Sequence, residues 1–171
     1  MASRTDSFDL AQLQLASGSG RRIDLHVALD DFEFGGRRYG VPDLLTRVTL
    51  DAARMASGYS LRLRFDADLD GPCMRCLEDA EEAVAVDARE IDQPGGGEDL
   101  DSPYVDGHEL DLHGWARDAL ALALPNQIVC RAECRGLCAV CGENLNTAEP
   151  GHAHERAPDP RWAKLGELRL E

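Results

Sequence analysis

The stretch "YSLRLRFDADL", residues 59–69, decides the fold because its apolar side chains recur at every second position. This period of two is that of a β-strand with one buried and one exposed face. The apolar positions are Tyr59, Leu61, Leu63, Phe65, Ala67 and Leu69. A strand with one buried and one polar face is typical of an antiparallel sheet, so the stretch predicts antiparallel architecture.

Shorter alternating runs on both sides predict an antiparallel meander. Residues 21–29 and 47–55 alternate apolar and polar residues, as do residues 81–91 after the central strand. Ser57-Gly58 fits a hairpin turn. Residues 30–43 are expected to form a turn-rich connection, and the pair Cys73-x-x-Cys76 is expected near the tip of the last hairpin.

Residues 109–126 change to helical spacing. Leu112, Trp115, Ala119 and Leu122 mark one face, which predicts a helix packed across the sheet with Trp115 in the core. Asp111 is a candidate N-terminal cap and Pro125 ends the helix. A short terminal helix is expected within residues 160–170.

These runs predict an α+β fold: an antiparallel β-meander packed by one main helix, with a small C-terminal zinc-knuckle region. Residues 1–91 would form the N-terminal sheet region, and residues 92–107, which include three consecutive glycines, an acidic linker or surface loop. Residues 108–171 would hold the main helix, the cysteine-rich knuckle and the terminal helix. We expect these regions to fold as one cooperative domain.

The net charge of −14 is concentrated in one segment. Residues 66–111 carry sixteen acidic residues and two arginines, a net charge of −14, whereas the two flanking segments are nearly neutral. Such a segment repels phosphate backbones and attracts basic surfaces, or serves only as a solvated acidic loop. Basic residues nowhere run longer than two, so direct RNA binding is weakly supported.

Several functional classes find no support in the sequence. The first twenty residues do not resemble a signal peptide, and the longest apolar run, residues 119–124, is too short to span a bilayer. We therefore expect a cytoplasmic protein with reduced thiols and no membrane partner. Phosphate-binding, dinucleotide and nucleophile-elbow motifs are absent from the sequence, so we expect no enzymatic activity and no small-molecule substrate.

The stretch "CRAECRGLCAVCGENLN", residues 130–146, holds four of the six cysteines. In a reducing compartment, cysteines this dense more often bind metal than form disulfides. The grouping that uses only cysteines close together in the sequence is one four-thiolate zinc site. Its ligands would be Cys130, Cys134, Cys138 and Cys141.

A second partition makes two tetrahedral sites. Cys73 and Cys76 would join Cys130 and Cys134, while Cys138 and Cys141 would join His152 and His154. Alternatively, the two histidines lie in a solvated loop and Cys73 and Cys76 are ordinary thiols. In either partition the ion has only protein ligands, so we expect structural zinc that contributes to folding and leaves no position open for a substrate.

The order of these motifs resembles the YceD-like family, which is associated with accumulation of large-subunit ribosomal RNA in bacteria and plastids. The resemblance covers roughly residues 20–168. It rests on C-x-R-C-L at residues 73–77, the helix ending in "LALP", and C-x-G-L-C-x-x-C-G-x-N-L-N at residues 134–146. Many relatives have a cysteine pair where this chain has His152 and His154, an exchange that preserves zinc-ligand capacity and favours the two-site partition.

The resemblance implies a non-enzymatic ribosome-biogenesis factor that supports synthesis, processing or stability of 23S rRNA. The expected partner is a pre-50S ribosomal particle or a basic large-subunit ribosomal protein held by the acidic segment. In another version of this hypothesis, the protein contacts rRNA phosphates directly while the acidic segment points away. The contacting residues would be Arg62, Arg64, Arg131 and Arg135. The alternative functions are a metal-thiolate redox sensor or a zinc-containing adaptor in transcription or translation.

Overall fold

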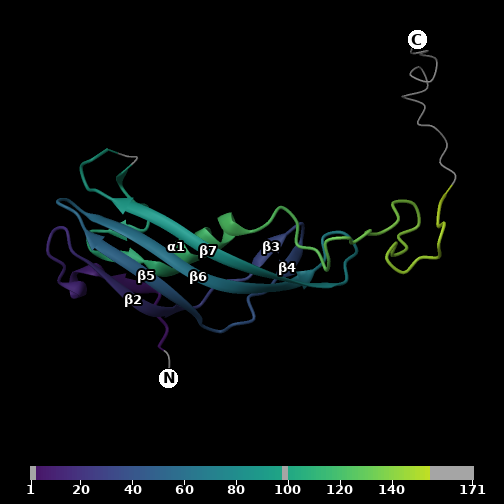
Figure 1. Cartoon of the computed structure of the whole chain (residues 1–171), viewed down its shortest axis with the longest axis horizontal. Coiled ribbons are helices and arrows are strands. Elements are labelled where there is room, and N and C mark those ends of the chain that lie inside the picture. Colours follow the sequence, from purple (N-terminus) through teal and green to yellow (C-terminus); the bar gives the residue numbers. More distant parts are fainter. Residues whose placement is uncertain (1–2, 98–99, 155–171) are drawn as a thin grey trace, which may run out of the picture.

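The computed structural model describes residues 3–97 and 100–154, and Figure 1 shows its arrangement. The elements in chain order are β1 (Ser7–Asp9), the short 3-10 helix η1 (Leu10–Leu13), β2 (Gly20–Val27), β3 (Phe32–Phe34), β4 (Arg37–Tyr39), β5 (Thr46–Arg54), β6 (Tyr59–Pro72), β7 (Asp79–Asp92), β8 (Val105–Asp106), β9 (Glu109–Asp111) and α1 (Leu112–Ala123). No helix within these described ranges is long and apolar enough to cross a membrane.

Four strands form the main antiparallel sheet in the order β2-β5-β6-β7, which confirms the predicted meander. β6 and β7 pair without interruption from Tyr59 opposite Asp92 to Pro72 opposite Asp79. The apolar residues of β6 are at most 6% exposed, so the face predicted from their alternation is the buried one. The long β6–β7 hairpin extends from this sheet and carries its turn to the side where the segment after α1 passes (Figure 1).

The turn between β5 and β6 requires glycine at its last position. The Met55 N–H donates to the Gly58 carbonyl at 3.1 Å, and Gly58 has a φ of +88°. A Cβ atom on Gly58 would come within 1.8 Å of the Asp92 carbonyl oxygen. The predicted Ser57-Gly58 turn is therefore confirmed, and a side chain at position 58 would separate β7 from it.

The predicted helix is α1, and it lies over the buried face of the sheet (Figure 1). The Asp111 carboxylate caps it by accepting the Gly114 N–H at 2.9 Å, and Leu124 before Pro125 is already extended. Trp115 is 2% exposed, which confirms its expected place in the core. The α+β fold class, with a mostly antiparallel sheet and one main helix, is confirmed.

Two stretches expected to lack regular structure contain strands. Within the turn-rich connection, β3 and β4 form a small hairpin around Gly35 and Gly36, both of which have positive φ. Three-residue strands are too short to produce a recognisable period of two, which is why the sequence pattern missed them. β8 lies inside the range expected as a linker, and it joins β9 and β1 in a three-stranded sheet.

The β3–β4 hairpin supports the far end of β6. The Tyr39 hydroxyl donates to the Pro72 carbonyl at 2.9 Å, and the ring lies so close to Gly71 that a Cβ there would come within 2.3 Å of Tyr39 Cδ1. Since Pro72 is followed by Cys73, this contact fixes the strand where the cysteine turn begins. The terminal helix expected within residues 160–170 lies outside the described residues.

Candidate metal centres

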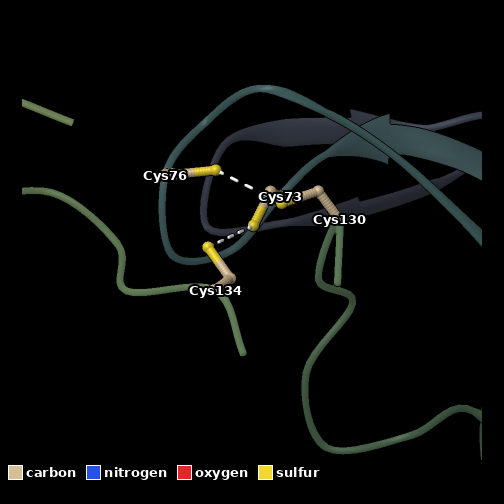
Figure 2. Close-up of side chains that lie close together, drawn as sticks. All are labelled: Cys73, Cys76, Cys130 and Cys134. Atoms are coloured by element: carbon tan, nitrogen blue, oxygen red, sulfur yellow. Dashed lines mark hydrogen bonds between the residues drawn. The ribbon is translucent and has the colours of Figure 1, made fainter. Parts of the chain in front are cut away.

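The first cysteine pair lies in the turn between β6 and β7, as predicted. The Cys73 N–H donates to the Glu78 carbonyl at 2.6 Å, and the Leu77 N–H donates to the Cys73 carbonyl at 3.0 Å. The Arg75 N–H points to the Cys73 sulfur at 3.4 Å. The chain leaves the turn through Leu77, which has a left-handed φ of +63°. This tight turn directs the side chains of Cys73 and Cys76 to the same side (Figure 2).

The chain that follows α1 runs back along this turn and is bonded to it. The Met74 N–H donates to the Ile128 carbonyl at 2.8 Å, and the Arg75 guanidinium donates to the Gln127 side-chain oxygen at 3.0 Å and the Cys134 carbonyl at 3.1 Å. Ile128 is 1% exposed, so burial of its apolar side chain further stabilises the contact between this segment and the turn. The arrangement brings Cys130 and Cys134 to the hairpin tip.

Four sulfur atoms from these two segments converge in one cluster (Figure 2). Cys73 Sγ lies 3.7 Å from Cys134 Sγ, Cys76 Sγ lies 3.6 Å from Cys130 Sγ, and all four lie within 4.8 Å of one another. A tetrahedral zinc ion with Zn–S bonds of about 2.3 Å spaces its sulfurs about 3.8 Å apart. The donor set and its spacing therefore fit one zinc ion.

The thiols of this cluster differ in acidity. Burial raises the pKa of Cys73, but backbone N–H groups of Cys130, Cys76 and Arg75 outweigh it and bring the pKa down to about 6. Burial, aided by the neighbouring sulfurs of Cys76 and Cys134, raises the pKa of Cys130 to about 12. Four negative sulfurs this close repel one another, so they ionise together only if a cation offsets their charge. A divalent metal ion would supply that charge.

Asn144 and Asn146 support the first cluster, although the sequence analysis gave them no role. The Asn146 side-chain amide donates to Cys134 Sγ at 3.4 Å, which lowers the pKa of that thiol. The Asn144 side chain donates to the Glu78 carboxylate at 2.8 Å, joining the later loop to the first turn. Both asparagines belong to the quoted C-G-x-N-L-N motif, whose spacing was the available signal.

The second cluster joins Cys138 and Cys141 to His152 and His154, all with ligand atoms within 4.8 Å of one another. His154 Nε2 lies 3.2 Å from Cys141 Sγ and 3.1 Å from His152 Nε2. His152 Nδ1 lies 3.0 Å from the Glu143 carboxylate, which leaves Nε2 facing the cluster. A carboxylate behind a histidine ring is the usual outer support of a zinc-binding imidazole. These residues fit a zinc ion with two sulfur and two nitrogen ligands.

The two C-x-x-C turns are built alike. The Cys138 N–H donates to the Glu143 carbonyl at 2.8 Å and the Gly142 N–H to the Cys138 carbonyl at 2.8 Å, which repeats the bonding of Cys73, Leu77 and Glu78. Gly142 has a φ of +76°, matching the left-handed Leu77. The backbone N–H groups of Cys141 and Val140, followed by the His152 side chain, lower the pKa of Cys138 to about 6. C-x-x-C-x-E is thus a repeated local unit.

The structure brings the predicted ligands together in the two-site partition. The single site of Cys130, Cys134, Cys138 and Cys141 is not formed, because the bonds of Met74 and Arg75 draw the first two cysteines to the hairpin tip. The first cluster is mostly buried, whereas Cys141 and His154 of the second are exposed. Metal occupancy of both clusters stays a prediction.

The part of the chain that holds the two clusters is also the part that matches a known protein family. The family model described as large ribosomal RNA subunit accumulation protein YceD matches residues 61–169, a range that begins in β6 and includes every candidate ligand. No solved structure matches the chain significantly.

The curated relatives are mycobacterial and plant proteins. An uncharacterized protein of Mycobacterium tuberculosis is 42% identical over 105 residues, which is 57% of this chain and 49% of the relative. An uncharacterized protein of Mycobacterium leprae is 38% identical over 103 residues, or 56% of this chain and 46% of the relative. The matched region thus spans about half the length of these relatives.

A more distant relative carries a descriptive name. The chloroplastic large ribosomal RNA subunit accumulation protein YCED homolog 1 of Zea mays is 33% identical over 82 residues, 48% of this chain and 24% of the relative. Because the family model covers well over half of the chain, including the hairpin and both clusters, this protein belongs to the YceD family of large ribosomal RNA subunit accumulation proteins.

Proposed function

We propose that the protein is a non-enzymatic assembly factor for the large ribosomal subunit and acts in the cytoplasm. In this proposal it supports the accumulation of 23S rRNA by holding a basic partner, either a large-subunit ribosomal protein or a pre-50S particle. The family description supports the general role. The observation that carries the mechanism is a row of unpaired carboxylates on the exposed face of β6 and β7.

The acidic row follows from the alternation of β6. Asp66, Asp68 and Asp70 alternate with buried residues, so they share the exposed face of the sheet. Glu81 of β7 lies opposite Asp70 in the register. Together with Pro42 and Ala83, three of these acids line an open hollow of about 470 Å³. Within residues 3–97 and 100–154, none of the four acids forms an ion pair, so their charge is available to a cationic partner.

Arg62 and Arg64, the two strand arginines considered for RNA contact, are each paired with a carboxylate, whereas Arg89 on the same face forms no ion pair within the described residues. Arg62 pairs with Asp87 at 2.5 Å, and Arg64 pairs with Asp51 at 2.8 Å. Arg22 also pairs with Asp51, at 2.6 Å. Exposed pairs of this kind are individually weak, yet they make Arg62 and Arg64 less available to a phosphate backbone. This argues for a protein partner rather than direct RNA contact through Arg62 and Arg64.

The metal centres have an architectural role in this proposal. Each cluster supplies four protein ligands. Four ligands complete the coordination of a tetrahedral zinc ion and leave no position for water or substrate. The first cluster would fasten the segment after α1 to the tip of the β6–β7 hairpin, next to the acidic row. The proposed function therefore needs a fixed acidic surface and no catalytic group.

The test is binding to purified large-subunit ribosomal proteins at graded salt. We compare the wild-type chain with a triple variant carrying Asp66→Asn, Asp68→Asn and Asp70→Asn. Because each lost ion pair is worth about 1 kcal/mol near water, the triple variant should bind at least about tenfold more weakly at low salt. Wild-type binding should also fall steeply as salt rises toward about 1 M, where charges are screened within about 3 Å.

A matched control removes the same number of charges elsewhere, through Asp43→Asn, Glu133→Gln and Glu149→Gln, all of which are exposed. This control should bind like the wild type. In cells lacking the gene, the control variant should restore the ratio of 23S to 16S rRNA and the triple variant should not. Equal binding by both variants, or RNA crosslinking through Arg62 and Arg64 in place of protein binding, would overturn the proposed mechanism.

A further inference from the structure

The outer edge of β7 has no partner strand in the part of the chain that the structure describes. β7 is the last strand in the order β2-β5-β6-β7 and pairs only with β6 (Figure 1). The loop that follows β7 lies close to the end of that strand, where the Gln93 N–H donates to the Leu100 carbonyl at 2.7 Å. The remaining edge, from Asp79 to Asp87, is long enough to accept a further strand.

The direction of the backbone groups along this edge follows from the hairpin. The Cys73 N–H donates to the Glu78 carbonyl, so Glu78 and every second residue after it face β6. The register of β6 and β7 has no bulge, so the alternation continues along the strand. Glu81, Ala83, Ala85 and Asp87 therefore direct their N–H and carbonyl groups to the open edge.

On the helix side of β7, a groove of about 330 Å³ runs between the strand and α1. Its apolar lining includes Val86, Ala88, Trp115 and Leu122. Leu122 is 89% exposed, although it belongs to the apolar face that the sequence analysis assigned to the core. A strand added beside β7 would place every second side chain on this side of the sheet, and those near Val86 and Asp87 would lie over the groove.

On the opposite side, the added strand would meet carboxylates. On this face β7 itself carries Asp79, Glu81 and Asp87, together with Arg89. The acidic row of Asp66, Asp68, Asp70 and Glu81 lies on this face. Like charges would oppose pairing with the β7 edge of a second copy of this chain, whereas lysine or arginine side chains would be attracted.

We propose that the open edge of β7 binds an extended basic segment of the partner as an additional antiparallel or parallel strand. Its apolar side chains would lie on the helix side, with those at one end entering the groove beside α1, and its lysine or arginine side chains would lie on the side of the acidic row. Main-chain hydrogen bonds would give affinity and the alternating side chains would give selectivity. The proposal rests on the proposed function for the basic character of the partner and adds the mode of binding.

The test uses a labelled ten-residue peptide of alternating lysine and valine, with a glutamate–valine peptide as the charge control, titrated by fluorescence anisotropy. The edge variant is Ala85→Pro. Ala85 is exposed and its N–H makes no bond to β6, so proline removes an edge donor while the β6–β7 ladder stays intact. We expect at least tenfold weaker peptide binding. Ala85→Thr, which keeps the N–H, should bind within twofold of the wild type.

A second measurement is independent of the variant's folding. Lysine–valine peptides carrying N-methyl groups on only the even or only the odd residues are titrated against the unaltered protein. Strand addition predicts that one of these two peptides binds at least tenfold more weakly than the other, because only one set of N–H groups faces β7. Equal binding of both peptides would overturn the proposal.

The outcomes separate this inference from the proposed function. If Ala85→Pro and both methylated peptides bind normally while the Asp66, Asp68 and Asp70 triple variant binds weakly, the acidic face holds its partner without strand addition. In that case only the inference fails. If the triple variant also binds normally, the proposed mechanism fails as well.

Discussion

The sulfur atoms of Cys73 and Cys134 lie 3.7 Å apart although 61 positions separate the two residues in the chain. Cys73 directly follows the paired length of β6, which ends at Pro72, and Cys134 lies in the segment after α1. A metal ion held between them would close a loop that contains β7, β8, β9 and the helix. The first cluster therefore acts on the whole fold, whereas the second closes a short local loop.

We predict that loss of one ligand has very different effects in the two clusters. Cys134→Ser should lower the free energy of unfolding by more than about 4 kcal/mol, because the metal's contribution to folding is lost. Cys141→Ser should change the main unfolding transition little, since Cys141 is exposed and far along the chain from the sheet. Urea unfolding followed by far-ultraviolet circular dichroism, which reports on the sheet and the helix, measures both; equal losses would contradict the assignment.

The left-handed residues of the two turns should respond differently to substitution. Gly142→Ala places a Cβ at a φ of +76°, which costs about 1–2 kcal/mol and should weaken zinc binding at the second cluster about 5- to 30-fold. Leu77→Gly, at the equivalent position of the first turn, should not weaken zinc binding there. Competition with a chromophoric chelator gives both affinities, and an unchanged affinity in Gly142→Ala would refute the equivalence of the turns.

Asp92 should make stability depend on pH. Its side chain is 3% exposed with one unpartnered carboxylate oxygen, and burial raises its pKa. A raised pKa in the folded state means that the charged form opposes folding, and that this cost appears as the pH rises through the folded-state pKa. Asp92→Asn should therefore be more stable than the wild type at pH 7.5.

The gain from Asp92→Asn should shrink as the pH falls through the folded-state pKa and vanish below the ordinary carboxyl value of about 3.9. Urea unfolding at several pH values between 7.5 and 5 follows the decline. A gain that grew on acidification would show that Asp92 is stabilised as a carboxylate.

Asp70 and Glu81 form a like-charge pair directly across the β6–β7 register. Such a pair is destabilising, so Asp70→Lys should raise the unfolding free energy by about 0.2–1 kcal/mol. The same change should weaken binding of the basic partner. Thermal unfolding and the graded-salt binding assay test the two effects, and a variant that was more stable and also bound normally would remove the functional reason for this pair.

The main sheet and the helix could be predicted because their side chains repeat over many residues. The six alternating apolar positions of β6 and the capped, proline-ended helix each carry several concordant signals. β3, β4 and β8 could not be found in this way, since two or three residues give no period. Their position depends on tertiary contacts such as that of Tyr39 with Gly71.

The ligand residues were visible in the sequence, but their grouping was decided by contacts between remote segments. Spacing along the chain favoured joining Cys130 and Cys134 to the next two cysteines. The bonds from Met74 and Arg75 to residues 127–137 outweigh that proximity by placing the segment against the hairpin tip. The repeated C-x-x-C-x-E unit was the local signal that each pair forms its own turn.

Native mass spectrometry of Cys73→Ser beside the wild type tests the central claim most directly. If the hairpin and the segment after α1 share one ion, the wild type carries two zinc ions and Cys73→Ser carries one, held by Cys138, Cys141, His152 and His154. An unchanged zinc count in Cys73→Ser, or a fully folded wild type without zinc, would contradict the account.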